Sequence, residues 1–278
     1  MEIIHTPAAL RAWRRSDPGS VGFVPTMGYL HEGHLTLARR SLAENDRTAV
    51  SIFVNPTQFG PNEDFTRYPR DEERDLRLLR EAGVHAVYFP TPAIMYPDGY
   101  QTYVSVEGVS RGLEGEARPG HFRGVATVVL KLFNACEPTR AYFGRKDAQQ
   151  LRVLRRMTTD LDLPVEIVPC DIVREADGLA MSSRNVYLTP EQRAAAPVIY
   201  RALHEARDRW SGGERDATAL RGLVAARIAA EPRAEIDDIS LADDETLDEI
   251  HGRARRPALL SLVVKFGATR LLDNIELG

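Results

Sequence analysis

The first 170 residues of this 278-residue chain alternate between two kinds of pattern, and this alternation restricts the possible folds more than any other feature. Apolar runs typical of buried strands occur at 21–24, 49–54, 84–89, 103–106, 140–143 and 165–168. Helical patterns lie between most of them, at 35–45, 70–82, 123–136 and 147–161. Strands that alternate with crossover helices pair in parallel, so we predict a Rossmann-like, doubly wound, mainly parallel α/β sheet. Ligands of such sheets bind at the carboxyl ends of the strands.

The pattern changes after about residue 177. Ala- and Arg-rich helical patterns at 190–209 and 214–230 precede short β-like runs near 236–241, 258–264 and 268–272. We therefore predict two domains, a Rossmann-like domain over 1–176 and a smaller α+β domain over 177–278, joined through the loop 171–189.

The charge balance disfavours two classes of protein. Lys and Arg number 36 and Asp and Glu 40, which gives a formal net charge of −4. General nucleic-acid binders and anionic-membrane binders need a basic excess to neutralise phosphates. The chain also has no run of about 18 apolar residues and no N-terminal pattern of a signal peptide. We expect a cytoplasmic protein with no nucleic-acid or membrane partner, in which Cys136 and Cys170 are free thiols.

Only three of the basic side chains are lysines, namely Lys131, Lys146 and Lys265. A compact ammonium is not replaced well by a planar guanidinium, so each lysine is a candidate for a specific role. For Lys131 and Lys265, which lie inside apolar runs, chance or a stem lying along apolar surface is the plainer interpretation.

The segment PTMGYLHEGH, residues 25–34, joins the first predicted strand to the first predicted helix. It places His31 and His34 beside the free backbone N–H groups at a helix N-terminus, an arrangement that suits a polyphosphate. Imidazoles there could donate hydrogen bonds to a phosphoryl group during its transfer. The alternatives are a solvated loop with two incidental histidines and half of a metal site.

Two further polar segments lie at boundaries of predicted elements. FVNPTQF, residues 53–59, places Asn55 and Gln58 at the end of the second strand, where amides could hold a hydroxyl group or could simply form a turn. GHFRG, residues 120–124, brings His121 and Arg123 to the start of the long apolar helix. A solvated cationic loop is the commoner outcome for such a segment.

Two other segments carry positive charge next to small or polar residues. FGRKDAQQ, residues 143–150, places Lys146 one residue before a predicted helix, where its ammonium adds to the helix dipole in binding anions. GLAMSSRN, residues 178–185, combines two hydroxyls with Arg184 between the predicted domains. This loop could be a closing phosphate clamp or merely a serine-rich linker.

Together these segments resemble the pantothenate synthetases, also called pantoate-beta-alanine ligases. The resemblance rests on six motifs in the same order, PTMGYLHEGH, FVNPTQF, RPGHFRGVATVV, YFGRKDAQQ, DGLAMSSRN and GATRLLDN, which span most of the chain. More widely, the HxGH signature is similar to that of nucleotidyltransferases such as class I aminoacyl-tRNA synthetases.

The resemblance implies an ATP-dependent condensation of pantoate with beta-alanine, with release of AMP and pyrophosphate. It further implies a pantoyl-adenylate intermediate, Mg²⁺ bound with the polyphosphate, and a homodimer. The first domain would bind nucleotide and pantoate, and the second would close over them.

The resemblance also implies roles for individual residues. The residues expected to act in catalysis are His34, His31, Lys146 and Arg184. The residues expected to bind ATP are Met27, Gly28, His31, His34, Gly144, Arg145, Lys146, Asp147, Val173, Met181, Ser182, Ser183 and Arg184. The residues expected to bind pantoate are Gln58, Gln150, Asn55 and Met27. The resemblance gives no ligands for Mg²⁺, and places His121 and Arg123 less securely.

Two other functions remain open at this point. A related adenylyltransferase could activate a different small carboxylate, although the two glutamine amides would then lack hydroxyls to bind. A non-catalytic nucleotide-binding regulator would need affinity for the nucleotide but no donors aimed at the transition state.

Overall fold

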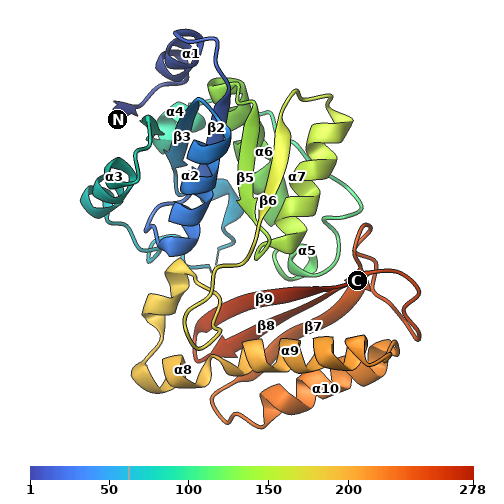
Figure 1. Cartoon of the computed structure of the whole chain (residues 1–278). Coiled ribbons are helices and arrows are strands. Elements are labelled where there is room, and N and C mark those ends of the chain that lie inside the picture. The colour runs from blue at the N-terminus through green and yellow to red at the C-terminus, as the bar shows by residue number, and fades with distance from the viewer. Residues whose placement is uncertain (62) are drawn as a thin grey trace. The chain divides into compact units, whose positions relative to one another are not determined.

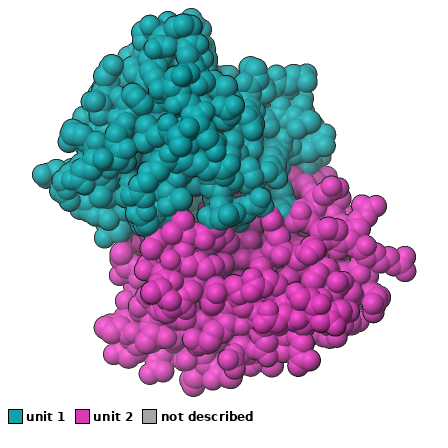
Figure 2. Space-filling model, viewed as in Figure 1, with its two compact units in different colours: residues 1–107, 118–145, 150–171 teal, residues 108–117, 146–149, 172–278 magenta. Residues whose placement is uncertain are grey.

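The computed structural model describes residues 1–61 and 63–278, and they form two compact units (Figure 2). Unit 1 comprises Met1–Glu107, Arg118–Arg145 and Gln150–Asp171. Unit 2 comprises Gly108–Ala117, Lys146–Gln149 and Ile172–Gly278. The last passage between the units therefore lies at residue 172 rather than 177, and two short segments from the first half of the chain belong to unit 2.

A six-stranded parallel sheet forms the centre of unit 1 (Figure 1). Its strands are β1 (Glu2–Ile4), β2 (Val21–Thr26), β3 (Arg47–Ile52), β4 (Ala86–Tyr88), β5 (Arg140–Gly144) and β6 (Glu166–Cys170). They lie in the order β1-β4-β3-β2-β5-β6, so the chain winds to one side of β2 and then to the other. The predicted doubly wound α/β fold is confirmed, and its topological switch point lies between β2 and β5.

Helices cover both faces of this sheet. The helices in or entering unit 1 are α1 (Pro7–Arg15), α2 (Glu32–Glu44), α3 (Glu72–Glu81), α4 (Pro92–Met95), α6 (His121–Cys136) and α7 (Ala148–Asp160). Figure 1 shows α2 in front of the sheet and α6 behind it. Leu35 and Ala38 of α2 and Leu79 of α3 share one buried apolar cluster with Val24 and Val50 of the sheet. Burial of these amphipathic faces provides most of the driving force for the layered structure.

Local sequence explains where the long helix α6 begins and ends. Its N-cap, Gly120, has φ +84°, a conformation that costs glycine little. The helix ends where Glu137 adopts φ +47°, directly before Pro138, which cannot continue an α-helix.

The predicted strand at 103–106 is wrong. This segment pairs with no strand among the described residues, and the backbone N–H of Val104 donates instead to Oγ1 of Thr127 on α6, at 2.9 Å. The ring of Tyr103 lies under the guanidinium of Arg123, 3.8 Å from its centroid. Side chains of α6 thus hold an extended segment whose composition resembles that of a strand.

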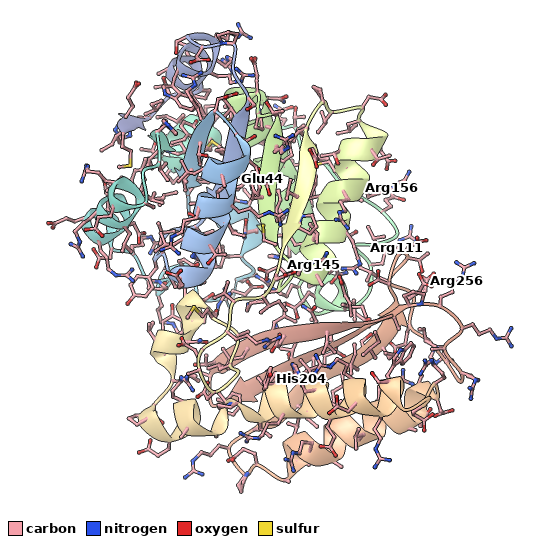
Figure 3. The ribbon with its side chains drawn as sticks, in the orientation of Figure 1. Glu44, Arg111, Arg145, Arg156, His204 and Arg256 are labelled. Carbon is pink, nitrogen blue, oxygen red and sulfur yellow. The ribbon has the colours of Figure 1, made fainter. Side chains whose placement is uncertain are left out.

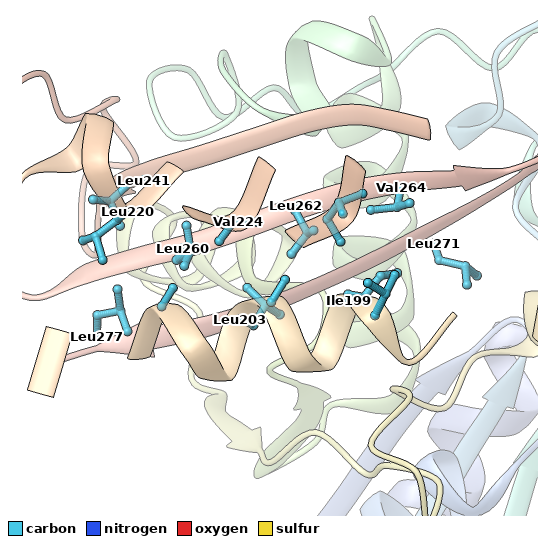
Figure 4. Packing of buried hydrophobic residues seen from close by; sticks show 14 of the residues in the cluster. Ile199, Leu203, Leu220, Val224, Leu241, Leu260, Leu262, Val264, Leu271 and Leu277 are labelled. Carbon is cyan, nitrogen blue, oxygen red and sulfur yellow. The ribbon is translucent and has the colours of Figure 1, made fainter. Parts of the chain in front are cut away.

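Unit 2 is an α+β layer built on a three-stranded antiparallel sheet. Its strands are β7 (Glu235–Asp243), β8 (Ala258–Phe266) and β9 (Thr269–Leu277), and its helices are α5 (Glu114–Ala117), α8 (Pro190–Ala195), α9 (Val198–Ser211) and α10 (Ala217–Ala229). Figure 4 shows Leu203 of α9 and Val224 of α10 packed against Leu260 and Leu262 of β8, all fully buried. The predicted α+β architecture of the C-terminal region is therefore confirmed.

Both cysteines, Cys136 and Cys170, are buried and free, as predicted. Within residues 1–61 and 63–278, no helix is long and apolar enough to cross a bilayer.

Candidate active site

The turn after β2 carries the histidine motif to the switch point of the sheet. Thr26 ends the strand, and its hydroxyl donates to the Ser51 carbonyl at 2.7 Å while accepting from the Gly28 N–H at 3.2 Å. Gly28 has φ +83°, and a Cβ there would lie 3.0 Å from Ile52 Cγ2. Tyr29 follows with φ +50°. Two successive left-handed residues turn the chain sharply between the end of β2 and the start of α2.

A carboxylate from helix α3 holds this turn in place. Asp75 is 1% exposed, and its two oxygens accept the backbone N–H groups of Tyr29 at 2.6 Å and Leu30 at 2.7 Å. Burial raises the pKa of Asp75, and these two hydrogen bonds oppose that shift. The sequence analysis missed this residue because its partners lie far away in the sequence.

Both histidines of the motif cap helix α2. The backbone N–H of Gly33 donates to Nδ1 of His31 at 3.2 Å, and the backbone N–H of His31 donates to Nδ1 of His34 at 3.3 Å. The ring centroids lie 4.0 Å apart. Since Nδ1 accepts in each ring, a neutral ring carries its proton on Nε2. In their neutral form the two imidazoles are therefore a pair of Nε2–H donors at a helix N-terminus, an arrangement that suits the binding of an anion.

The turn after β3 brings together two of the predicted pantoate-binding residues. Asn55 caps the 3₁₀ turn η1 (Pro56–Gln58), and its Nδ2 donates to Oε1 of Gln58 at 3.0 Å. Asn55 Oδ1 accepts from the hydroxyl of Tyr96 at 2.8 Å, and the side chain is only 1% exposed. Gln58 Nε2 lies 3.4 Å from the sulfur of Met27. Asn55 is thus bound within the protein, while Gln58 and Met27 adjoin each other beside the end of β2.

The remaining predicted residues of unit 1 follow β5. Gly144 ends the strand, and the backbone N–H of Arg145 donates to the Cys170 carbonyl at 2.8 Å. Figure 3 labels Arg145 at this end of the sheet. Its guanidinium lies 3.4 Å from the exposed carboxylate of Asp171. Gln150 is half-buried on the first turn of α7.

Lys146 belongs to unit 2 and is fixed by a residue from the far end of the chain. The helix α7 begins at Ala148, so Lys146 lies in a turn two residues before it rather than one. Asn274 on β9 donates from Nδ2 to the Lys146 carbonyl at 2.7 Å. Asp147 beside it is exposed. The GATRLLDN segment therefore positions the backbone that carries the lysine.

The MSSRN loop lies in the same unit. Ser182 caps the 3₁₀ turn η2 (Ser183–Tyr187), and its hydroxyl accepts from the Arg184 N–H at 3.2 Å. The Met181 N–H donates to the Val173 carbonyl at 3.0 Å. A small pocket within unit 2 is lined by Lys146, Leu179, Ala180, Ser182, Asn185, Ile199, Leu271, Leu272 and Asp273.

A buried ion pair supports this pocket. The Arg174 guanidinium donates to both oxygens of Asp273, at 2.6 and 3.1 Å, and to the Gly178 carbonyl at 3.1 Å. Asp273 is 2% exposed, so the pair lies in a weakly polar environment where two-point geometry matters most. The predicted site residues thus fall into two groups, one at the strand ends of unit 1 and one around the lysine of unit 2.

The chain matches a known protein family along almost its whole length. A family model described as pantoate-beta-alanine ligase matches residues 2–276. The chain belongs to the pantoate-beta-alanine ligase family. The family predicted from the motifs is therefore confirmed.

Individual ligases of the family match over nearly their full lengths. The pantothenate synthetase of Roseiflexus castenholzii is 58% identical over 274 residues, 99% of this chain and 98% of the relative. The pantothenate synthetase of Thermus thermophilus matches in structure with a TM-score of 0.94 at 48% identity, covering 100% of this chain and 99% of that one.

A third ligase has been solved with small molecules bound. The pantoate-beta-alanine ligase of Francisella tularensis, crystallised in complex with beta-gamma ATP and beta-alanine, has a TM-score of 0.81 and 32% identity. The match covers 99% of this chain and 97% of the Francisella chain.

Proposed function

We propose that this chain condenses pantoate with beta-alanine at the expense of ATP, through a pantoyl-adenylate. The observation that carries the proposal is the similarity to pantothenate synthetases along the whole chain. The fold supplies the required elements, because a pair of imidazole donors lies at the switch point of a doubly wound sheet.

The chemistry requires activation of a carboxylate. An oxygen of the pantoate carboxylate attacks the α-phosphorus of ATP, and the bond from that phosphorus to the bridging oxygen breaks, so that pyrophosphate leaves. The neutral amine of beta-alanine then attacks the acyl carbonyl, AMP departs and the nitrogen loses a proton. No step needs a nucleophile from the protein.

The residues of unit 1 are proposed to bind both substrates of the first step. The Nε2–H groups of His31 and His34 would donate to phosphate oxygens as charge develops during transfer. Gln58 and Gln150 would bind the hydroxyls of pantoate, with Met27 against its methyl groups. Backbone groups of Gly28, Gly144 and Arg145 would contact the nucleotide.

The residues of unit 2 are proposed to contact ATP as well. Lys146, Ser182, Ser183 and Arg184 would bind phosphate oxygens, with Asp147, Val173 and Met181 at the nucleoside. The Asn274 contact and the Arg174–Asp273 pair would keep these groups in position.

Mg²⁺ is proposed as a partner of ATP rather than as a resident ion. Among residues 1–61 and 63–278, no group of three or more His, Cys, Asp or Glu side chains is arranged as a metal site. Mg²⁺ commonly keeps several waters and binds through substrate phosphates with few protein ligands, where it neutralises charge on the leaving pyrophosphate. We further propose a cytoplasmic homodimer, and light scattering coupled to size exclusion tests the dimer.

The deciding experiment is exchange of labelled pyrophosphate into ATP. With Mg²⁺ present and beta-alanine absent, we expect exchange that depends on pantoate. Exchange supported by another small carboxylate but not by pantoate would identify a related adenylyltransferase. ATP binding with no exchange under any carboxylate would identify a regulator and refute the adenylate mechanism.

A further inference from the structure

A chain of hydrogen bonds within unit 1 leads from a carboxylate to the backbone of Gln58. Glu63 forms a two-point ion pair with Arg118, and Nη1 of Arg118 lies 3.1 Å from Nε2 of His121. Nδ1 of His121 lies 2.9 Å from the carbonyl oxygen of Gln58. His121 is 9% exposed, so these contacts are largely shielded from water.

The partners of His121 determine which ring nitrogen carries the proton. A guanidinium can only donate, so Nε2 of His121 accepts from Arg118. A carbonyl can only accept, so Nδ1 carries the hydrogen and donates to Gln58. These two contacts favour one ring tautomer, with Glu63 fixing the arginine that selects it.

The 3₁₀ turn η1, which contains Gln58, also contacts helix α6 and the side chain of Asn55. Helix α6 approaches it so closely that a Cβ on Gly124 would lie 2.4 Å from the Thr57 carbonyl oxygen. Asn55 donates to Oε1 of Gln58 at 3.0 Å and to the Gly124 carbonyl at 3.2 Å. Oε1 of the Gln58 amide accepts a hydrogen bond from Asn55. The other side of the amide carries Nε2, which is a donor. The turn thus presents Gln58 with a fixed backbone and a fixed amide orientation.

We propose that His121 is a positioning residue for pantoate, acting by anchoring the Gln58 backbone while Asn55 orients the Gln58 amide as a hydrogen-bond donor. The proposal rests on the proposed function, in which Gln58 binds pantoate. It assigns the GHF segment before α6 a role in substrate affinity that requires no contact between His121 and the substrate. Preorganisation of this kind lowers the ordering cost of binding.

The test uses pyrophosphate exchange to compare three variants of His121. His121→Leu removes both hydrogen bonds, and we expect the KM for pantoate to rise by about tenfold or more with the KM for ATP changed less than about twofold. His121→Asn places an amide N–H near the Nδ1 position and should restore most of the pantoate affinity. His121→Gln reaches the Nε2 position instead and should not.

A double-mutant cycle separates positioning from general destabilisation. If His121 acts through Gln58, His121→Leu should raise the pantoate KM far less in a Gln58→Ala background than in the wild type. His85→Leu is the matched control, since His85 binds the Thr48 N–H at the opposite end of the sheet. It should leave both KM values unchanged.

Each outcome bears on one of the two proposals. A wild-type protein without pantoate-dependent exchange would refute the proposed function itself. If exchange is present, three results would each overturn the positioning role of His121. These are an unchanged KM for pantoate in His121→Leu, an equal rise in the KM values for pantoate and ATP, and an effect of His121→Leu that is fully additive with that of Gln58→Ala. If His121→Leu fails to fold, the other two variants decide. A lower KM for pantoate in His121→Asn than in His121→Gln supports the proposal, and the reverse order refutes it.

Discussion

Asp75 and Leu30 lie 45 residues apart in the sequence, yet Oδ1 of Asp75 accepts the backbone N–H of Leu30 at 2.7 Å. The other oxygen accepts the N–H of Tyr29, so one buried carboxylate spans the turn that precedes the two histidines. The conformation of the turn that precedes His31 and His34 therefore depends on helix α3, a helix that carries none of the motif residues.

Replacement of Asp75 by Asn should slow the reaction without unfolding the protein. An amide offers one acceptor oxygen in place of two, and its NH₂ group would face a backbone donor, at a cost of about 1–3 kcal/mol. We expect kcat for pyrophosphate exchange to fall by about tenfold or more. The exposed neighbour Glu72 provides the control, since Glu72→Gln should leave the rate unchanged. Equal rates in the two variants would show that the turn holds its conformation without Asp75.

Removal of single donors should impair adenylation much more strongly. His34→Ala and Lys146→Ala should each reduce the rate of exchange by at least about a hundredfold, as is typical when one preorganised donor to a transition state is lost. Single-turnover formation of AMP provides a second measurement. The controls are His251→Ala, an exposed histidine, and Lys265→Ala, a lysine that forms an ion pair with Asp237. Normal turnover in either test variant would mean that the phosphates bind elsewhere.

Two glycine-to-alanine replacements should have opposite effects on stability. Gly124→Ala would place a methyl group 2.4 Å from the Thr57 carbonyl oxygen, so the helix or the turn must shift, and we expect a loss of about 1–3 kcal/mol together with weaker pantoate binding. Gly222→Ala, on helix α10, meets no atom within 4 Å and should gain about 0.5–1 kcal/mol. Urea unfolding measures both changes. A neutral Gly124→Ala would contradict the close approach of α6 to the turn.

Lowering the pH should reduce the stability of unit 2 through protonation of Asp237. Burial pushes the pKa of Asp237 up, but hydrogen bonds and charges from Lys265 and Arg270 outweigh it and hold the pKa below its usual value. A lowered folded-state pKa contributes stability above the usual value near 3.8, and this contribution disappears as the pH falls through the folded-state pKa.

Asp237→Asn should therefore be less stable than the wild type at pH 7 by about 1 kcal/mol, and the difference should vanish once the pH falls below the folded-state pKa of Asp237. Thermal unfolding at several pH values measures this difference in stability between the variant and the wild type. Glu245→Gln, in an exposed turn, should show no gap at any pH. A gap that persists in strong acid would mean that lost packing, and not lost charge, causes the destabilisation.

The sequence predicted the parts of the fold that local patterns encode. The alternation of apolar runs and helices predicted the parallel sheet, and the motifs at strand ends indicated His31, Gln58 and Lys146 as site residues. Family membership is confirmed, whereas the residue roles still await the experiments above. The strand at 103–106 was wrong because β-propensity does not show whether a partner strand exists. The hydroxyl of Thr127 instead accepts the backbone N–H of Val104, which lies in this segment.

Contacts between distant segments could not be predicted in the same way. Asp75 lies in an ordinary amphipathic helical pattern, and nothing in that pattern marks its burial or its two backbone partners. The same applies to Asn274, which binds the Lys146 carbonyl across 128 positions of sequence. A single sequence gives periodicity but no pairing between such positions.

The interleaved course of the chain limits how this enzyme can be dissected. The polypeptide changes unit at 107/108, 117/118, 145/146, 149/150 and 171/172, so no single cut releases either unit intact. A recombinant fragment starting at residue 172 would lack Glu114, whose carboxylate forms an ion pair with Arg270, and Gln149, whose amide donates to the carbonyls of Val109 and Gly112. Split-protein reporters and domain-swapped chimaeras would consequently need internal grafts instead of simple truncation.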